Sequence, residues 1–306
     1  MRRSASNLAA SVHQRLLNKA RESGRPFNEL LQYFAIERFI YRLSKSPKGT
    51  NFILKGALMF FVWDRPGSRP TLDIDLAGRI SNDPDEIISA MQETCITPVD
   101  PDGLSFEPSS VRAAAIVEDA QYQGIRTHLK GNLGKAEIHL QVDIGFGDAI
   151  VPEAATINYP ALLDFPSARL KGYTMESTIA EKFQAMVKLG VINSRMKDFY
   201  DVWLLSEFYR FEGERLGQAL TATFTTRNTP FDDIPSLFDA SFSKNQGKET
   251  QWRSFIHKSK ITGAPQSFER VTAALNRFLR PVWMALAAGR PFDANWKPSG
   301  PWQMRT

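Results

Sequence analysis

The chain has 306 residues, 42% of them hydrophobic and 23% charged, which is ordinary globular composition and enough length for two modest domains. A formal net charge of +5 at pH 7 favours phosphate-bearing partners without specifying a fold. The only cysteine, Cys95, excludes an intrachain disulfide and a cysteine zinc site. The first residues lack the apolar core of a signal peptide, and the most apolar stretch, residues 52–63, contains Lys55 and is too short to span a membrane. We therefore expect a cytoplasmic protein with no membrane partner.

The amino-terminal half of the chain predicts helices followed by strands. Apolar side chains recur at helical spacing over residues 5–22 and 27–44. The breaker SPKGT leads into NFILKG, which predicts a short buried strand, and then into ALMFFVW, which predicts the first turns of a helix. After the loop RPGSRP, the stretch TLDIDLAGRI alternates as a strand and places Leu72, Ile74 and Leu76 on one face.

Farther along the chain, strands give way to helices. Residues 83–94 predict a helix with acidic residues in its first turn, and residues 104–160 predict a β-rich region that includes the alternating stretch AEIHLQVDIGFGD. ARLKGYT predicts one more short strand. Helical periodicity then dominates up to an irregular tail at residues 292–306. It predicts helices at 175–189, 195–209 and 212–224, and later helices that include 266–288. The expected fold is α+β, with a mixed sheet flanked by helices in residues 1–165 and a mainly helical domain in residues 166–306.

Two aspartates on the alternating strand suggest a metal site. Asp73 and Asp75 stand two residues apart, so both side chains leave the same face. Two carboxylates this close repel each other unless a cation lies between them, and Mg²⁺ is suited because it is usually bound by one or two carboxylates plus substrate phosphates. Asp143, on the polar face of another predicted strand, would complete a site for one or two ions. An isolated D-x-D is more often a solvated pair on an open sheet face. The neighbouring residues therefore determine whether a metal site is the better interpretation.

The residues before the aspartates suit a phosphate ligand. Gly56 permits a close approach of the backbone to a phosphate, and a helix that begins there offers free N–H groups and a positive dipole end. Arg65 and Arg69 add positive charge in the intervening loop. These neighbours favour a ligand that carries both phosphate and a metal ion.

The segment from the glycine to the aspartates resembles the signature of polymerase-β-type nucleotidyltransferases, and more narrowly that of the AbiEii-type nucleotidyltransferase toxins of type IV toxin–antitoxin systems. That family typically shows K-G-G-[ST] followed by R-x-[ST]-x-D-I-D-L. The matching residues are Lys55, Gly56, Arg69, Thr71, Asp73, Ile74, Asp75 and Leu76. Ala57 departs from the family, which usually has a second glycine or a serine there. A side-chain hydroxyl contact to phosphate is lost at Ala57, while a backbone N–H contact would survive.

A second family motif, E-x-x-x-A-E-K followed by R-x-K-D-x-Y-D, matches farther along the chain. The matching residues are Glu176, Ala180, Glu181, Lys182, Arg195, Lys197, Asp198, Tyr200 and Asp201. Helical spacing places Lys182 on a core-facing stripe, and Asp198 and Asp201 share a stripe on the next helix. A lysine in that position needs an anionic partner or an exit to solvent. Either Lys182 and Asp201 form a structural pair, or Lys182 faces a nucleotide triphosphate while Asp201 orients it or helps to activate the acceptor hydroxyl.

The resemblance implies a polymerase-β-like nucleotidyltransferase that uses an NTP and Mg²⁺. It implies catalytic roles for Asp73, Asp75, Lys182 and Asp201, with Asp73, Asp75 and Asp143 as metal ligands. It implies nucleotide binding by Lys55, Gly56, Ala57, Arg69, Thr71 and Lys182. Family members are toxins that inhibit growth or abort phage infection, some by adding nucleotides to the 3′ end of tRNA. The implied partners are therefore tRNA or another RNA acceptor, and an antitoxin with a DNA-binding domain.

Two alternatives remain open at the level of sequence. One is an enzyme that nucleotidylates a protein or a small molecule. The other is a nucleotide-binding regulatory module without turnover, which the departure at Ala57 allows.

Overall fold

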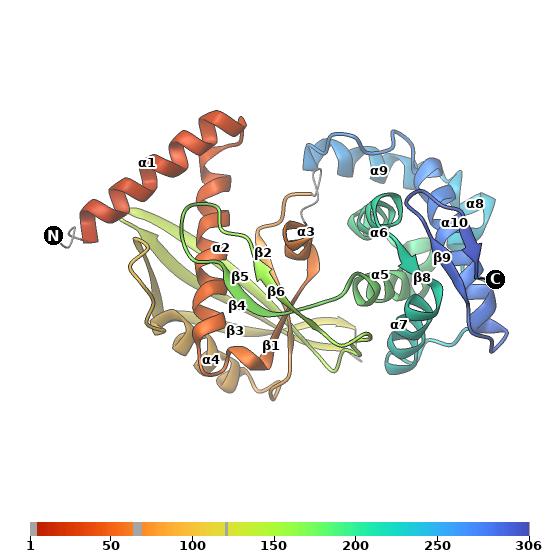
Figure 1. Cartoon of the computed structure of the whole chain (residues 1–306), viewed down its shortest axis with the longest axis horizontal. Helices are drawn as coiled ribbons and strands as arrows, with labels where there is room; N and C mark the ends of the chain where they lie inside the picture. Colours follow the sequence, from red (N-terminus) through yellow and green to blue (C-terminus); the bar gives the residue numbers. More distant parts are fainter. Residues whose placement is uncertain (1–4, 64–68, 120–121, 306) are drawn as a thin grey trace. The chain divides into compact units, whose positions relative to one another are not determined.

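The computed structural model describes residues 5–63, 69–119 and 122–305, which divide into two units (Figure 1). The first unit contains the described residues up to 63, with 71–147 and 155–172, and the second contains 69–70, 148–154 and 173–305. Most of the predicted loop RPGSRP, including Arg65, lies outside the described residues. No helix in the described part is long and apolar enough to cross a membrane.

The helices of the first unit follow local sequence signals closely. They are α1 (Ala5–Ser23), α2 (Phe27–Lys45), α3 (Met59–Val62) and α4 (Pro84–Ile96), with short 3₁₀ helices η1 (Gly49–Asn51) and η2 (Gly56–Leu58). At α4, the Asp83 side chain accepts a hydrogen bond of 2.9 Å from the backbone N–H of Asp85, and Pro84 takes the first helical position. The helices predicted at 5–22, 27–44 and 83–94 are confirmed to within two residues.

The strands of the first unit form a mixed seven-stranded sheet in the order β3-β4-β5-β2-β1-β7-β6. Their bounds are β1 (Phe52–Lys55), β2 (Asp73–Gly78), β3 (Leu104–Asp119), β4 (Tyr122–Leu133), β5 (Ala136–Phe146), β6 (Ala155–Tyr159) and β7 (Ala168–Gly172). The β2–β5 and β1–β7 pairs are parallel, and the other neighbours are antiparallel. The prediction that Leu72 extends the apolar face of β2 is wrong. Pairing with β5 begins only at Asp73, so Leu72 is not held in the strand and is 51% exposed.

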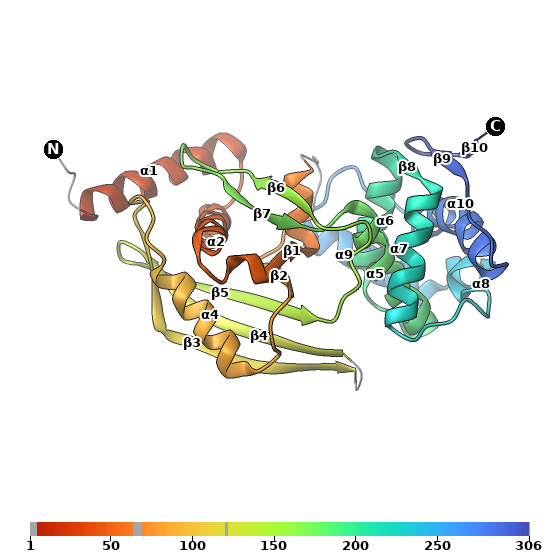
Figure 2. The ribbon, with the colours of Figure 1, turned by 60° about the horizontal axis from the view of Figure 1, so that its bottom comes forward.

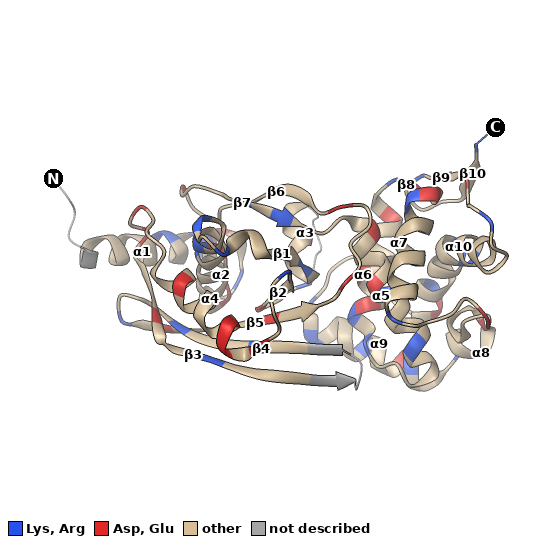
Figure 3. Ribbon diagram, turned by 90° about the horizontal axis from the view of Figure 1, so that it is seen from below, with Lys and Arg blue, Asp and Glu red and all other residues tan. Residues whose placement is uncertain are grey.

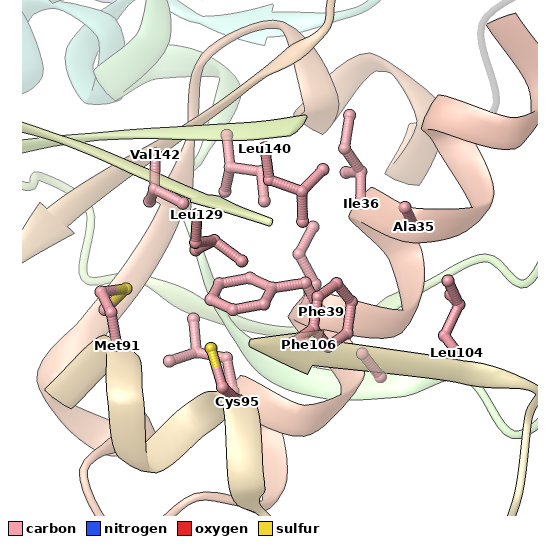
Figure 4. Close-up of a cluster of buried hydrophobic side chains, with 14 of the residues drawn as sticks. Ala35, Ile36, Phe39, Met91, Cys95, Leu104, Phe106, Leu129, Leu140 and Val142 are labelled. Carbon is pink, nitrogen blue, oxygen red and sulfur yellow. The ribbon is translucent and has the colours of Figure 1, made fainter. Parts of the chain in front are cut away.

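The hydrophobic core of the first unit fixes which way the aspartates point. Helices α2 and α4 cover one face of the sheet (Figure 2), and side chains from both helices meet those of β3, β4 and β5 there (Figure 4). Ile74 and Leu76 of β2 belong to this core and are fully buried. Because strand residues alternate between faces, Asp73 and Asp75 lie on the opposite face of the sheet.

The second unit is mainly helical. Its helices are α5 (Met175–Leu189), α6 (Met196–Phe208), α7 (Gly213–Thr226), α8 (Ala240–Ser243), α9 (Gln246–Ser259) and α10 (Phe268–Ala287), with η3 (Gly190–Ile192) and η4 (Ser236–Phe238). The helices predicted at 175–189, 195–209, 212–224 and 266–288 correspond to α5, α6, α7 and α10 and are confirmed. Helices α8 and α9 were not predicted individually.

The prediction of an irregular tail is wrong. The strands β8 (Phe211–Glu212), β9 (Ala294–Trp296) and β10 (Trp302–Met304) form a small antiparallel sheet in the order β10-β9-β8. Trp296 is 2% exposed, and its indole N–H donates a hydrogen bond of 2.7 Å to the Ser206 carbonyl. Burial of the Trp296 side chain therefore orders the tail, which shows no regular alternation of apolar and polar residues.

Candidate active site

The turn after β1 brings the backbone and a carboxylate unusually close together within the first unit. Gly56 has a φ of +72°, a conformation that favours glycine. A Cβ atom at Gly56 would lie 2.1 Å from Oδ2 of Asp75, so a larger residue would displace that carboxylate. Glycine at this turn therefore makes room for Asp75 as well as setting the backbone that leads into η2.

Charged side chains form a row across four strands on the face opposite α2. Register places Asp75 beside Lys55 of β1 and beside Asp143 of β5, and places Asp143 beside Arg126 of β4. Asp73, two residues before Asp75, lies beside Gln141. The two central acids of this row are thus flanked by a cation on each side, so part of their mutual repulsion is offset before any ligand binds.

Asp143 already has protein partners. The Arg126 guanidinium donates to both of its carboxylate oxygens, with Nε–Oδ1 at 2.8 Å and Nη2–Oδ2 at 2.7 Å. The Gln141 side-chain amide lies 3.2 Å from Oδ2. Such a bidentate pair holds the carboxylate firmly. The metal-ligand role of Asp143 therefore stays a prediction, and sequence reasoning missed Arg126. The two-residue turn between β4 and β5 fixes the hairpin register, and that register would have placed Arg126 opposite Asp143.

The donor chemistry of the acidic pair fits Mg²⁺. Asp73 and Asp75 are both partly exposed and offer only oxygen ligands, which Mg²⁺ prefers. In the described part of the chain, no group of three or more His, Cys, Asp or Glu side chains is arranged to hold a metal. A metal at this pair would therefore take further ligands from water or from substrate phosphates, as Mg²⁺ commonly does.

With Gly56, three more of the predicted nucleotide-binding residues lie close to this pair in the chain or in the sheet. Lys55 ends β1 directly opposite Asp75, and Ala57 is 2% exposed in η2. Thr71 is buried just before β2, and its backbone N–H donates a hydrogen bond of 3.2 Å to the Tyr33 hydroxyl of α2. The structure thus brings Lys55, Gly56, Ala57, Thr71, Asp73, Asp75 and Asp143 together in the first unit.

The other predicted site residues, Arg69, Lys182 and Asp201, belong to the second unit. Lys182 lies on α5, and its side chain is 12% exposed. Its Nζ is 2.8 Å from Oδ1 of Asp198 and 2.9 Å from Oδ2 of Asp201, both on α6. The predicted Lys182–Asp201 pair is present, and Asp198 shares it.

Arg69 completes this ion cluster. Its Nε lies 3.1 Å from Oδ1 of Asp201, and its Nη2 lies 3.2 Å from Oδ2 of the same carboxylate. Burial alone would raise the pKa of Asp201, but Arg69 and Lys182 outweigh it and hold that pKa below its usual value. Burial alone would lower the pKa of Lys182, but the carboxylates of Asp198 and Asp201 raise it above its usual value. Lys182 and Asp201 are therefore both ionised at neutral pH.

The helices that carry the cluster are set by their ends. The Thr174 side chain caps α5 by accepting a hydrogen bond of 3.2 Å from the backbone N–H of Ser177. Just before α6, Oδ1 of Asn193 accepts a hydrogen bond of 2.8 Å from the backbone N–H of Arg195. These local contacts mark where α5 and α6 begin.

A second buried polar network lies next to Lys182 and was missed from the sequence. Arg227 follows the last residue of α7. Its Nη2 lies 2.9 Å from Oδ1 of Asp148 and 3.4 Å from Oε1 of Glu181 on α5. The Tyr173 hydroxyl lies within hydrogen-bond distance of both carboxylates, at 3.2 and 2.9 Å. Burial and these two acids raise the pKa of Tyr173, so the phenol stays protonated. The only sequence signal was Glu181 in the second motif, whose partners are remote in the chain.

Comparisons with known proteins agree with these observations. The family described as "Nucleotidyl transferase AbiEii toxin, Type IV TA system" matches residues 38–276. That range includes both the Gly56–Asp75 segment and the Lys182–Asp201 segment. No curated protein matches the chain.

Two solved structures from Helicobacter pylori also match. JHP933 is 13% identical, with 86% of this chain and 94% of that chain covered and a TM-score of 0.49. A proposed nucleotidyltransferase is 14% identical, with 87% of this chain and 99% of that chain covered and a TM-score of 0.49. With the family match extending over most of its length, the chain belongs to the AbiEii family of nucleotidyl transferase toxins of type IV toxin–antitoxin systems.

Proposed function

We propose that the protein is a Mg²⁺-dependent nucleotidyltransferase that acts in the cytoplasm and transfers a nucleotide from an NTP to the 3′ end of tRNA. The observation that carries the proposal is the approach of the Asp75 carboxylate to the Gly56 turn, in a chain of this family. Transfer to tRNA would inhibit growth or abort phage infection. A toxin of a type IV system implies an antitoxin, and we propose that this antitoxin carries a DNA-binding domain.

In the proposed reaction, the acceptor hydroxyl oxygen bonds to the α-phosphorus, the bond from that phosphorus to the β-phosphate bridging oxygen breaks, and pyrophosphate leaves. The hydroxyl proton passes to water or to a nearby base. Asp73 and Asp75, with Asp143, would hold Mg²⁺, which when bound neutralises charge on the phosphoryl oxygens. The other groups position the nucleotide: the backbone N–H groups at Gly56 and Ala57, and the side chains of Lys55, Arg69, Thr71 and Lys182.

The ion cluster favours one of the two roles considered for Asp201. Its carboxylate binds both Lys182 and Arg69, and its pKa is lowered. A carboxylate with a lowered pKa is a poor proton acceptor. We therefore propose that Asp201 orients Lys182 and Arg69 rather than taking the proton of the acceptor hydroxyl.

The activity is tested by incubating the protein with labelled NTPs and Mg²⁺, together with total tRNA or cell lysate. Label on RNA is the expected result. Label on protein or on a small molecule would instead identify a different acceptor. Bound NTP with no label transferred would point to a regulatory module without turnover.

The site is tested by removing its charges one at a time. Asp73→Asn, Asp75→Asn and Lys182→Met should each lower the transfer rate about 100-fold or more, the loss typical of one group that stabilises the transition state. Asp164→Asn is the matched control, because Asp164 is fully exposed. Thermal denaturation of each variant shows whether it folds. Full transfer by Asp73→Asn or Lys182→Met would refute the site assignment even if the activity is correct.

Asp143 needs a separate experiment because Arg126 already binds it. If Asp143 is a metal ligand, the loss of rate in Asp143→Asn should be recovered in part at high Mg²⁺ concentration. A rate that stays low at every Mg²⁺ concentration would instead assign Asp143 to positioning, through its pair with Arg126.

A further inference from the structure

A basic pocket of about 580 Å³ lies within the second unit. It is lined by Arg69 and Pro70, by the first residues of α6 and by one side of α9. Among the lining residues that the structure describes, the charged ones are Arg69, Arg195, Lys197 and Lys258, and none is a carboxylate. In Figure 3, blue segments on the ribbon of α9 mark its Lys and Arg positions. The volume is within the range of roughly 300–1,000 Å³ that is usual for ligand sites.

The walls of the pocket are held together by buried contacts. The Lys248 ammonium of α9 is 4% exposed and donates a hydrogen bond to the backbone carbonyl of Asn193, just before α6. The Tyr200 ring of α6 contacts Trp252 and Phe255 of α9, with ring centroids 6.3 and 5.9 Å apart. These contacts therefore hold the lining residues of the two helices in a defined arrangement.

The pocket keeps an excess of positive charge after its internal ion pairs are counted. Arg69 pairs with Asp201, and Nε of Arg195 lies 4.0 Å from Asp198. Lys197 and Lys258 are exposed, and neither makes an ion pair with any carboxylate among the described residues. These two lysines therefore give the pocket positive charge that no carboxylate of the described residues offsets. The start of α6 adds the positive end of a helix dipole.

We propose that this pocket binds the phosphodiester backbone of the acceptor RNA, with Phe255 as a platform for one base. Single-stranded nucleic acids are typically bound by a positive groove combined with an aromatic face, and Phe255 is half-buried in the pocket wall. An NTP in this reaction arrives with Mg²⁺ and needs carboxylates that can bind the metal, and none is among the lining residues that the structure describes. Phosphodiesters carry one charge each and need only direct contacts from Lys and Arg. The inference rests on the proposed function for its acceptor, RNA.

The test measures RNA binding rather than transfer. The dissociation constant of a 5′-fluorescein-labelled tRNA transcript is measured by fluorescence anisotropy at several salt concentrations. The pocket variant is Lys197→Ala/Lys258→Ala, and the control with equal charge is Lys244→Ala/Lys297→Ala, two exposed lysines of the same unit that do not line the pocket. The affinity of each variant for a labelled NTP is measured in parallel.

The pocket variant should bind the tRNA at least about tenfold more weakly than the control. Its slope of log affinity against log salt should be shallower by roughly 1.4, because each lost contact to a single strand contributes about 0.7. Its NTP affinity should equal that of the control. Phe255→Leu should weaken tRNA binding without changing the salt slope, because it removes a stacking face and no charge.

Three results would overturn the proposal: no tRNA binding by the wild type, equal tRNA affinity in the pocket and control variants, or weakened NTP binding with tRNA binding unchanged. The proposed function can fail separately. Tight, pocket-dependent tRNA binding with no label transferred would remove the proposed activity and leave the pocket assignment standing. Normal label transfer with pocket-independent tRNA binding would do the reverse.

Discussion

Gly56 is subject to two separate constraints, and they can be separated by mutation. Its φ of +72° disfavours any other residue, and a Cβ would collide with the Asp75 carboxylate at 2.1 Å. Gly56→Ala should therefore lower the free energy of unfolding of the first unit by more than the roughly 1–2 kcal/mol of a left-handed alanine alone. It should also abolish nucleotide transfer, because Asp75 has to move. Urea denaturation and the transfer assay measure the two effects.

Gly24 provides the matched control for this variant. It has a similar φ of +67°, it belongs to the same unit, and nothing lies within 4 Å of a Cβ built on it. Gly24→Ala should show only the backbone cost and retain transfer activity. If both variants lost the same stability and both stayed active, the close approach to Asp75 would have no functional importance.

Glu37 predicts a pH dependence of stability in the first unit. It is 2% exposed on α2, where one oxygen accepts a hydrogen bond from the backbone N–H of Leu162 and the other lies 3.3 Å from Nε of Arg38. Burial raises the pKa of Glu37 from 4.5 to about 7. Between these two values the folded state holds a proton that the unfolded state has lost, so the free energy of unfolding should fall as pH rises.

Glu37→Gln tests this dependence because glutamine does not titrate. From pH 4.5 to 7 the wild type should lose roughly 3 kcal/mol of unfolding free energy relative to the variant, at about 1.4 kcal/mol per pH unit. Urea denaturation of both proteins at pH 4.5, 6 and 7.5 gives the difference. Parallel profiles for the two proteins would show that folding does not shift the pKa of Glu37.

At the scale of elements, the small sheet β8–β9–β10 should contribute strongly to the stability of the second unit. The Trp296 ring is buried and lies 4.8 Å from that of Phe278 on α10. Trp296→Ala should lower the free energy of unfolding by about 3–5 kcal/mol, the usual cost of removing a large buried ring. Met304→Ala on β10 is the control, because Met304 is 67% exposed. Thermal denaturation compares the two, and equal shifts in melting temperature would contradict the role of the sheet.

The strands of this sheet could not be predicted from the sequence, whereas the long helices of the same unit could. Helices α5 and α6 could be predicted to within a residue because periodicity and caps such as Thr174 are local signals. Strands β9 and β10 have three residues each, too few to show alternation, and Pro298 and Pro301 between them suggest a loop. Their register, Trp302 opposite Trp296, is fixed by burial against α10, which a local pattern does not contain.

Across the chain as a whole, the charges of the candidate site and one of their pairs could be predicted from the sequence, but the other pairs could not. Spacing alone placed Lys182 on a buried stripe, and a buried lysine requires an anion, so the Asp201 contact could be anticipated. The Arg69–Asp201 contact joins residues 132 apart in the chain, and no local rule connects them. The grouping of basic residues around Lys258 likewise depends on how α9 packs against α6.

Removal of the metal should abolish catalysis without unfolding the protein. Because no three acidic or histidine side chains of the described residues form a preformed metal site, Mg²⁺ should be bound with the NTP rather than as part of the fold. EDTA should therefore abolish transfer while leaving the melting temperature and the tRNA affinity unchanged, and added Mg²⁺ should restore transfer. A fall of several degrees in melting temperature would assign the metal a structural role. Transfer that persists in EDTA would rule out Mg²⁺ dependence, and Asp73 and Asp75 would then have to act through their own charge.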